Sequence, residues 1–163
     1  MVVRKMSVCC SLFEKDLILC SDAQTQDEVF DEIGNILMEK GLVKESFIEA
    51  IKSREKEYPT GLDLSPVEKG LSNVAIPHTE PEYCRSQSIV FVKLNNEVTF
   101  KNMISPEVDV SVTYLFFIIN NKKQNQTNVL SNLMAFLTNK ENVKNLDTLN
   151  SAESIYNFLT NKF

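Results

Sequence analysis

One predicted strand becomes wholly apolar along its length, and it constrains the fold of this 163-residue chain more than any other segment. From Val108 to Tyr114 apolar and polar residues alternate, which is the pattern of a strand with one exposed face. From Leu115 to Ile119 every residue is apolar, which is the pattern of a strand that is covered on both faces. We therefore predict an α/β sandwich, in which helices flank a sheet.

Amphipathic helices are predicted on both sides of this strand in the sequence. Thr25 and Glu28 have the spacing of a capping box, and the helix that follows should end at Gly41. A second helix is expected from about Lys44 to Glu57, before Pro59. Two more should follow a polar loop at 120–125, one with the apolar residues Val129, Leu130, Leu133, Met134 and Leu137 and one over about Ser151 to Thr160.

Other short apolar runs predict the remaining strands, at Leu17–Leu19, at Val74–Ile76 and at Ser88–Leu94. Residues 61–73 between them are expected to form a loop. The order is one strand, two helices, three strands and then helices, which predicts a mixed sheet in a single domain over 1–163. The first ten or so residues are expected to be loosely ordered.

Composition excludes several classes of function. The net charge of −5 without a basic cluster argues against nucleic-acid binding, and the longest apolar run is too short to insert in a membrane. Four cysteines without a CxxC pair, beside one histidine, do not form a zinc set, and no GxGxxG or Walker A sequence indicates a nucleotide. We expect no cofactor, no metal, no signal peptide and free thiols in the cytoplasm.

The single histidine of the chain, His78, is the first candidate for chemistry. Pro77 cannot donate to a sheet ladder, so the strand before it should stop and His78 should begin a loop. Such a histidine can be a nucleophile, a base or a metal ligand. It can also simply end a strand, and the residues alone slightly favour that structural role.

Arg54 is the second candidate. Phe47, Ile51, Arg54 and Tyr58 share one helical stripe, which puts a guanidinium on or beside an apolar face. The long side chain could extend past the apolar surface to water. Alternatively it could point at an anion site, because the planar guanidinium makes two parallel hydrogen bonds to phosphate.

Two segments together carry a resemblance to a known family. SREKEYPTG at 53–61 and VAIPHTE at 74–80 resemble the enzyme IIA component of the sugar phosphotransferase system, in its fructose/mannitol-type branch and closest to galactitol-type IIA. A strand at 110–119, a polar loop and a Leu-x-x-Leu helix (Leu130, Leu133) extend the resemblance over about 12–163. It implies a fructose/mannitol-type sandwich, a mixed sheet flanked by helices.

The resemblance also implies roles. His78 would accept a phosphoryl group on Nε2 from the phosphocarrier protein HPr and pass it to a cysteine of a IIB partner, which serves the membrane component IIC. A phosphoryl group in flight needs positioned donors, which Arg54 and the hydroxyl or backbone N–H of Thr79 could supply. Glu80 should not touch phosphate, because like charges repel, and would orient the loop or stay in solvent.

One position departs from the mannitol and fructose types, which often carry a second histidine at the start of the Leu-x-x-Leu helix. Gln126 stands there, as in galactitol-type relatives, which also tend to lack that histidine. Glutamine can donate hydrogen bonds to a phosphoryl group but does not titrate, and a helix start suits an anion. An ordinary polar residue at a helix start is equally consistent with the pattern. Cys84 is interpreted as structural.

Two other functions remain open for the chain. One is a free regulatory IIA-like module that senses phosphorylation without feeding a transporter, and the other is a binding domain with a vestigial histidine. In the carrier function the partners should dock around His78 on a small apolar surface, for which Tyr58 and Leu62 are candidates. The stripe that contains Tyr58 places it rather in the core. No residue here encodes the sugar, which IIA does not touch.

Overall fold

A computed structural model describes residues 12–163, except for the side chain of Asn125. Its five-stranded sheet has the order β1-β4-β5-β3-β2. The pairs β1–β4 and β3–β5 are parallel, whereas β4–β5 and β2–β3 are antiparallel, so the sheet is mixed as predicted. The strands are β1 (Phe13–Ser21), β2 (Gly61–Leu62), β3 (Asn73–Ala75), β4 (Gln87–Lys101) and β5 (Asp109–Asn120). The start of the chain, expected to be loosely ordered, lies outside the described residues.

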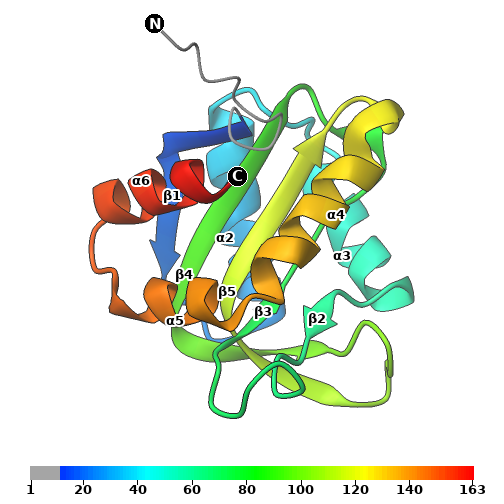
Figure 1. Cartoon of the computed structure of the whole chain (residues 1–163). Helices are drawn as coiled ribbons and strands as arrows, with labels where there is room; N and C mark the ends of the chain where they lie inside the picture. Colours follow the sequence, from blue (N-terminus) through cyan, green and yellow to red (C-terminus); the bar gives the residue numbers. More distant parts are fainter. Residues whose placement is uncertain (1–11) are drawn as a thin grey trace, which may run out of the picture.

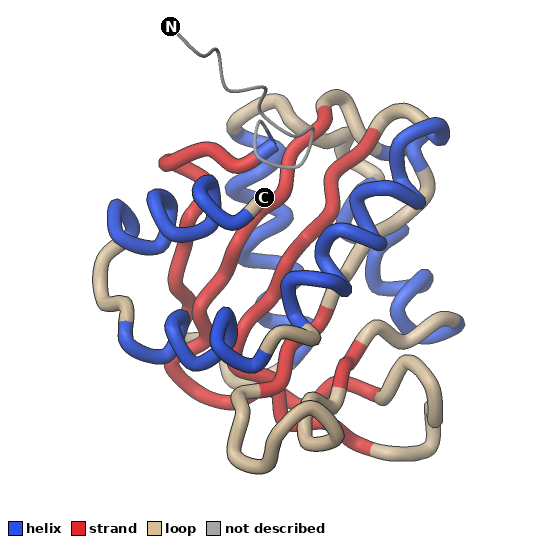
Figure 2. Tube along the Cα trace, viewed as in Figure 1, coloured by secondary structure: helices blue, strands red, loops and turns tan. Residues whose placement is uncertain are grey.

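Helices cover both faces of the sheet (Figures 1 and 2). On one face lie α2 (Gln26–Glu39) and α3 (Phe47–Glu57), and on the other lie α4 (Gln126–Leu137), α5 (Lys140–Thr148) and α6 (Ala152–Lys162). Short 3-10 turns occur at η1 (Pro81–Tyr83) and η2 (Lys123–Asn125). The predicted sandwich is confirmed.

The second half of β5 explains the apolar run. Phe116 and Ile118 are buried against α4, α5 and α6, whereas Leu115, Phe117 and Ile119 are buried against α2 and α3. Successive side chains of a strand point to opposite faces, so a strand between two helical layers needs apolar residues throughout. β5 is therefore the central support of both cores.

α2 has the capping interaction at its start and the glycine after its end that the sequence predicted. The hydroxyl of Thr25 accepts from the backbone N–H of Glu28 at 3.2 Å, as in a capping box. The carboxylate of Glu28 accepts from the N–H of Gln24, one residue before the cap, at 2.8 Å. Gly41 follows the helix with φ of 73°, the left-handed conformation that glycine adopts at no steric cost.

Several predicted boundaries are wrong. The first strand, expected at Leu17–Leu19, extends from Phe13 to Ser21. The expected loop at 61–73 opens with the short strand β2, and β4 continues past Leu94 to Lys101, because the polar residues at 95–97 interrupt the pairing only locally. The sequence prediction also missed α5. That helix buries only Val143, Leu146 and Asn142, so its polar sequence resembles solvated surface. α3 starts at Phe47, later than expected.

Gly61 in β2 lies against the end of β4, and this close approach generates a prediction. A Cβ at Gly61 would lie 2.6 Å from the carbonyl oxygen of Lys101, so β2 would have to move. We expect Gly61→Ala to lower the free energy of unfolding by about 1–3 kcal/mol, measured by urea denaturation. Ser65→Ala, in the exposed loop that follows, should change it by less than about 0.5 kcal/mol. Equal stability of the two variants would contradict the close approach.

Candidate functional site

His78 lies where β3 and β5 both approach their carboxyl ends. β3 ends at Ala75, but the backbone after it still forms hydrogen bonds with the segments on both sides. The N–H of Ile76 donates to the carbonyl of Thr60 at 3.2 Å, and the N–H of Ile118 donates to the carbonyl of Pro77 at 3.1 Å. The backbone is thus held by hydrogen bonds up to the residue before His78.

One hydrogen bond defines the chemistry of the imidazole. Nδ1 of His78 lies 2.8 Å from the carbonyl oxygen of Ile76. A carbonyl oxygen can only accept, so Nδ1 carries the proton and Nε2 keeps its lone pair. The nucleophilic atom of this histidine is therefore Nε2, as the family resemblance implies.

The surroundings of His78 favour its neutral form. Burial lowers the pKa of His78, and the cation of Arg54 lowers it further. The carbonyl of Ile76 and the carboxylate of Glu80 oppose this shift without reversing it. A neutral imidazole with a free Nε2 can act as a nucleophile near neutral pH.

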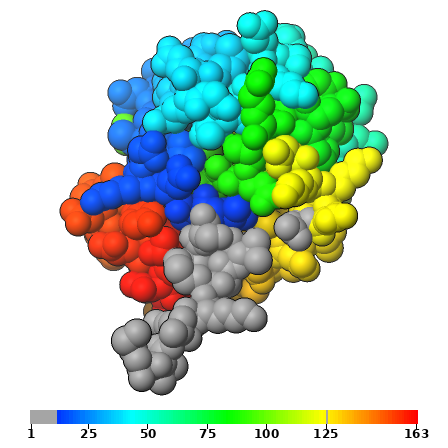
Figure 3. All heavy atoms as spheres, turned by 90° about the horizontal axis from the view of Figure 1, so that it is seen from above, coloured from blue at the N-terminus to red at the C-terminus, as the bar shows by residue number. Residues whose placement is uncertain are grey.

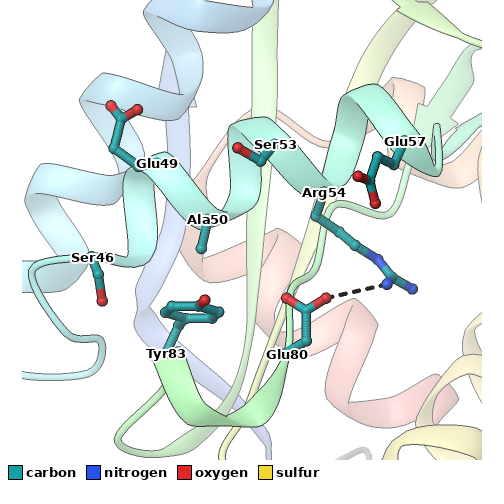
Figure 4. A pocket seen from close by; sticks show the side chains of 8 residues that line it. All are labelled: Ser46, Glu49, Ala50, Ser53, Arg54, Glu57, Glu80 and Tyr83. Carbon is teal, nitrogen blue, oxygen red and sulfur yellow. Dashed lines mark hydrogen bonds and ion pairs between the residues drawn. The ribbon is translucent and has the colours of Figure 1, made fainter.

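Arg54 is held in place rather than extended freely into water. Its Nη1 lies 3.2 Å from Oε1 of Glu80 (Figure 4). Its guanidinium carbon lies 4.2 Å from the centroid of the Tyr58 ring. Its side chain is 32% exposed. Arg54 lowers the pKa of His78 and Glu80 raises it, so both charges lie within electrostatic range of the imidazole.

The expectation that Tyr58 belongs to the core is wrong. Its side chain is 56% exposed, because α3 ends at Glu57 and Tyr58 has left the helical conformation (φ −132°, ψ 81°). The expectation that Leu62 is exposed is also wrong, since β2 turns it into the core. Of the two candidates for a partner surface, only Tyr58 is accessible.

Thr79 and Glu80 form a connected pair. Thr79 is buried, and its hydroxyl donates to Oε2 of Glu80 at 2.8 Å. This bond, a hydrogen bond from the backbone of Glu80 and, after them, the cation of Arg54 lower the pKa of Glu80. Glu80 therefore stays ionised. Glu80 thus orients Arg54, a role that the sequence analysis did not expect, since it expected Glu80 to orient the loop or stay in solvent. Because its proton is directed at Glu80, the hydroxyl of Thr79 would have to turn away from Glu80 to reach an anion.

Gln126 is the first residue of α4, on the same edge of the sheet. Figure 3 looks down on this edge, where green atoms of the β3–β4 region lie between cyan atoms near α3 and yellow atoms of the segment leading into α4. Among the described residues, no hydrogen bond joins Gln126 to His78. The structure thus brings Arg54, Thr79 and His78 together through bonds and charge, whereas for Gln126 it shows only that α4 begins at the same edge of the sheet.

Cys84 is buried, and burial raises the pKa of its thiol. A thiol in this state is a poor nucleophile, which agrees with the structural role expected for it. Cys20 and Cys84 are free thiols, whereas Cys9 and Cys10 lie outside the described residues.

Glu55 is a functional candidate that the sequence analysis missed. Its side chain is buried, at 3% exposed, and accepts from the backbone N–H and the hydroxyl of Thr60 at 2.8 and 2.9 Å. Burial raises the pKa of Glu55 to about 7, although the two bonds from Thr60 oppose the rise. The available signal was the spacing of Phe47, Ile51 and Glu55, which places a carboxyl group in the buried stripe.

A hollow of about 340 Å³ lies beside the Arg54–Glu80 pair (Figure 4). It is formed by one face of α3 and the segment after His78, and it is lined by Ser46, Glu49, Ala50, Ser53, Arg54, Glu57, Glu80 and Tyr83. Carboxylates outnumber cations in this lining, so the surface next to the site is acidic.

Over the described range 12–163, no cluster of three His, Cys, Asp or Glu residues could hold a metal ion. None of the helices in that range combines the length and the apolar character needed to cross a membrane.

Comparison with known proteins shows the family. Residues 11–162 match the family described as "Phosphoenolpyruvate-dependent sugar phosphotransferase system, EIIA 2". The chain belongs to this family. It is 32% identical over 124 residues to the galactitol-specific EIIA component of Escherichia coli K12, covering 76% of this chain and 79% of that protein. It is 28% identical over 152 residues to a mannitol-specific EIICBA component of Buchnera aphidicola, covering 91% of this chain and 22% of that longer protein.

Solved IIA structures share the fold. The mannitol-specific cryptic enzyme IIA of Escherichia coli superposes with a TM-score of 0.72 at 21% identity, covering 94% of this chain and 99% of that one. IIA in the complex with phosphorylated IIB of the Escherichia coli mannitol system gives 0.71 at 22% identity, covering 92% and 99%. The chain is thus a IIA component of the phosphotransferase system with the fructose/mannitol-type fold.

The buried carboxyl group of Glu55 generates a prediction about pH. Its pKa is about 7 in the folded protein against an ordinary 4.5, so the folded state binds more protons than the unfolded state between these values. Stability should therefore fall as the pH rises through this window. Relative to Glu55→Gln, we expect the native chain to lose about 3 kcal/mol of unfolding free energy between pH 4.5 and 8, measured by urea denaturation at several pH values. A difference that does not change with pH would contradict the raised pKa.

Proposed function

We propose that His78 is a transient phosphoryl carrier: its Nε2 accepts a phosphoryl group from HPr and passes it to a cysteine of a IIB partner during sugar uptake. The observation that carries this proposal is the hydrogen bond from Nδ1–H of His78 to the carbonyl of Ile76. It leaves Nε2 as the reacting nitrogen of a ring that burial keeps neutral.

The transfer consists of two displacements at phosphorus. The lone pair of Nε2 attacks the phosphoryl group of phospho-HPr, the new N–P bond forms, and the electrons of the breaking bond return to the atom of HPr that carried the group. In the second step a thiolate of IIB attacks the same phosphorus, and the N–P electrons return to Nε2. The carbonyl of Ile76 stabilises the positive charge that the ring carries while it is phosphorylated, because Nδ1 keeps its proton.

Three groups are proposed to stabilise the phosphoryl group in flight. Arg54 supplies a cation that is already oriented by Glu80, and positioned charge of this kind stabilises a transition state at little reorganisation cost. Thr79 supplies its hydroxyl or its backbone N–H, and Gln126 supplies an amide at the start of α4. No cofactor or metal is required by this scheme.

The proposed partners follow from the relatives. One solved relative is a complex of a mannitol IIA with phosphorylated IIB, and the galactitol-specific relative is 32% identical. We propose a IIB of the galactitol or a related polyol type as acceptor, in the cytoplasm, which in turn serves the membrane component IIC. The exposed ring of Tyr58, beside Arg54, is a contact for these partners.

Phosphorylation in vitro tests the carrier function. With phosphoenolpyruvate, enzyme I and HPr, intact mass should show a gain of one acid-labile phosphoryl group on the native chain, and no gain on His78→Ala. Galactitol-type IIB should then remove the group. No gain on the native chain, while a known IIA is phosphorylated by the same HPr, would refute the proposal. Phosphorylation that no IIB discharges would favour a regulatory module.

Arg54 provides a quantitative prediction. Arg54→Gln should slow single-turnover transfer from phospho-HPr about 100-fold, because one positioned donor is lost from the transition state. Lys56→Gln removes an equal charge from an exposed position of the same helix and should leave the rate within about 3-fold, because exposed charges have weak effects. Equal rates for the two variants would exclude a specific role for the guanidinium.

A further inference from the structure

We infer that Glu55 is a positioning residue for His78, which it orients through the backbones of Thr60 and Ile76; the inference rests on the proposed role of His78 as nucleophile. Glu55 does not contact the imidazole. Three consecutive hydrogen-bonded links connect the two side chains, and each link is present in the structure.

The first link fastens Thr60 to α3. Oε1 of Glu55 accepts from the backbone N–H of Thr60 at 2.8 Å, and the hydroxyl of Thr60 lies 2.9 Å from both carboxyl oxygens. Two donors of one residue meet one buried carboxyl group, so both the place and the orientation of the Thr60 backbone are defined. A buried carboxyl group is costly without such partners.

The second link joins Thr60 to Ile76. β2 and β3 pair Leu62 with Val74 and Gly61 with Ala75, and the bond from Ile76 N–H to Thr60 O at 3.2 Å is the next rung of this ladder. Because Pro77 has no N–H, the N–H of Ile76 is the last backbone donor on the β2 side before His78. A strand of two residues has few rungs of its own, so the anchor at Thr60 keeps this end from fraying.

The third link is the bond that sets the tautomer of His78. Ile76 is held through its N–H, and its carbonyl then receives Nδ1–H of His78 at 2.8 Å. If Thr60 is released, Ile76 keeps no hydrogen bond on the β2 side, and its carbonyl can rotate away from the ring. The expected result is a mixture of tautomers, in which part of the protein has its lone pair on the wrong nitrogen.

Glu55 directly follows Arg54 in α3, and this position relates the hydrogen-bonded links to the proposed phosphoryl transfer. Arg54 points to the surface pair with Glu80, while Glu55 points into the interior to Thr60. The same turn of α3 thus holds the cation that faces the phosphoryl group and the backbone that positions the nucleophile. Small displacements of reacting groups cost large factors in rate, so a shared anchor is effective.

Three variants test the inference. Glu55→Met keeps the size but removes both acceptors, whereas Glu55→Gln keeps an acceptor for the N–H of Thr60. Ile51→Ala is the matched control, because it weakens the same buried stripe of α3 four residues earlier without touching Thr60. His78 is the only histidine, so an untagged chain gives ring nitrogen signals in NMR that belong to one residue.

We expect Glu55→Met to lower the fraction of the Nδ1–H tautomer and to slow transfer from phospho-HPr about 10-fold or more. Glu55→Gln should stay within about 3-fold of the native rate with the native tautomer, and Ile51→Ala should lose stability while it keeps both. A native tautomer and rate in Glu55→Met would overturn the inference and leave Glu55 a purely structural residue.

Two further outcomes distinguish the positioning role of Glu55 from the proposed function of His78. If the native chain is not phosphorylated but Glu55→Met still changes the tautomer, the proposed function fails and the positioning role stands. If Glu55→Met does not fold, Thr60→Val and Thr60→Ser decide, since only the serine variant keeps the hydroxyl that the carboxyl group binds. A native tautomer and rate in Thr60→Val as well as in Thr60→Ser would then refute the inference.

Discussion

The hydrogen bond from Nδ1–H of His78 to the carbonyl of Ile76 is the interaction on which the site depends. Either nitrogen of a neutral imidazole can carry the lone pair, and the tautomer decides which one does. This bond places the proton on Nδ1 and leaves the lone pair on Nε2. Burial and the nearby cation then keep the ring uncharged, so geometry and electrostatics favour the same reacting atom.

The rigidity behind that bond comes from the sheet. β3 has only three residues, and a strand of that length is weak alone. It lies beside β5, whose second half is buried on both faces, and the bond from Ile118 N–H to Pro77 O extends this support past the end of the strand. The apolar run in β5 therefore stabilises two cores and also the loop that holds the histidine.

The layers of the fold and the family could be predicted from the sequence, for physical reasons. The apolar run of β5 predicted the layers, because periodicity reports burial directly. The motif around His78 and Arg54 predicted the family, since the residue types at these spacings are specific in combination. The extent of β4 and the existence of α5 were not predicted, because polar residues conceal elements that bury few side chains.

Two features needed coordinates. The exposure of Tyr58 depends on where α3 ends, and one residue decides whether the stripe continues into the core or leaves it. The connection from Glu55 to His78 passes through two backbones that are distant in sequence, and no pattern of residue types reports a backbone hydrogen bond. Sequence can show that a carboxyl group lies in a buried stripe, but not which donor it meets.

The ion pair between Arg54 and Glu80 also determines which anions the site admits. At rest the guanidinium is already neutralised and stacked on the Tyr58 ring. A free phosphate or sugar phosphate from solution must compete with a tethered carboxylate for it, and gains no covalent bond in return. A phosphoryl group on Nε2, as in the proposed function, would be tethered as well and would compete on equal terms. In the proposed function, the ion pair would therefore favour a covalently held phosphoryl group over free anions.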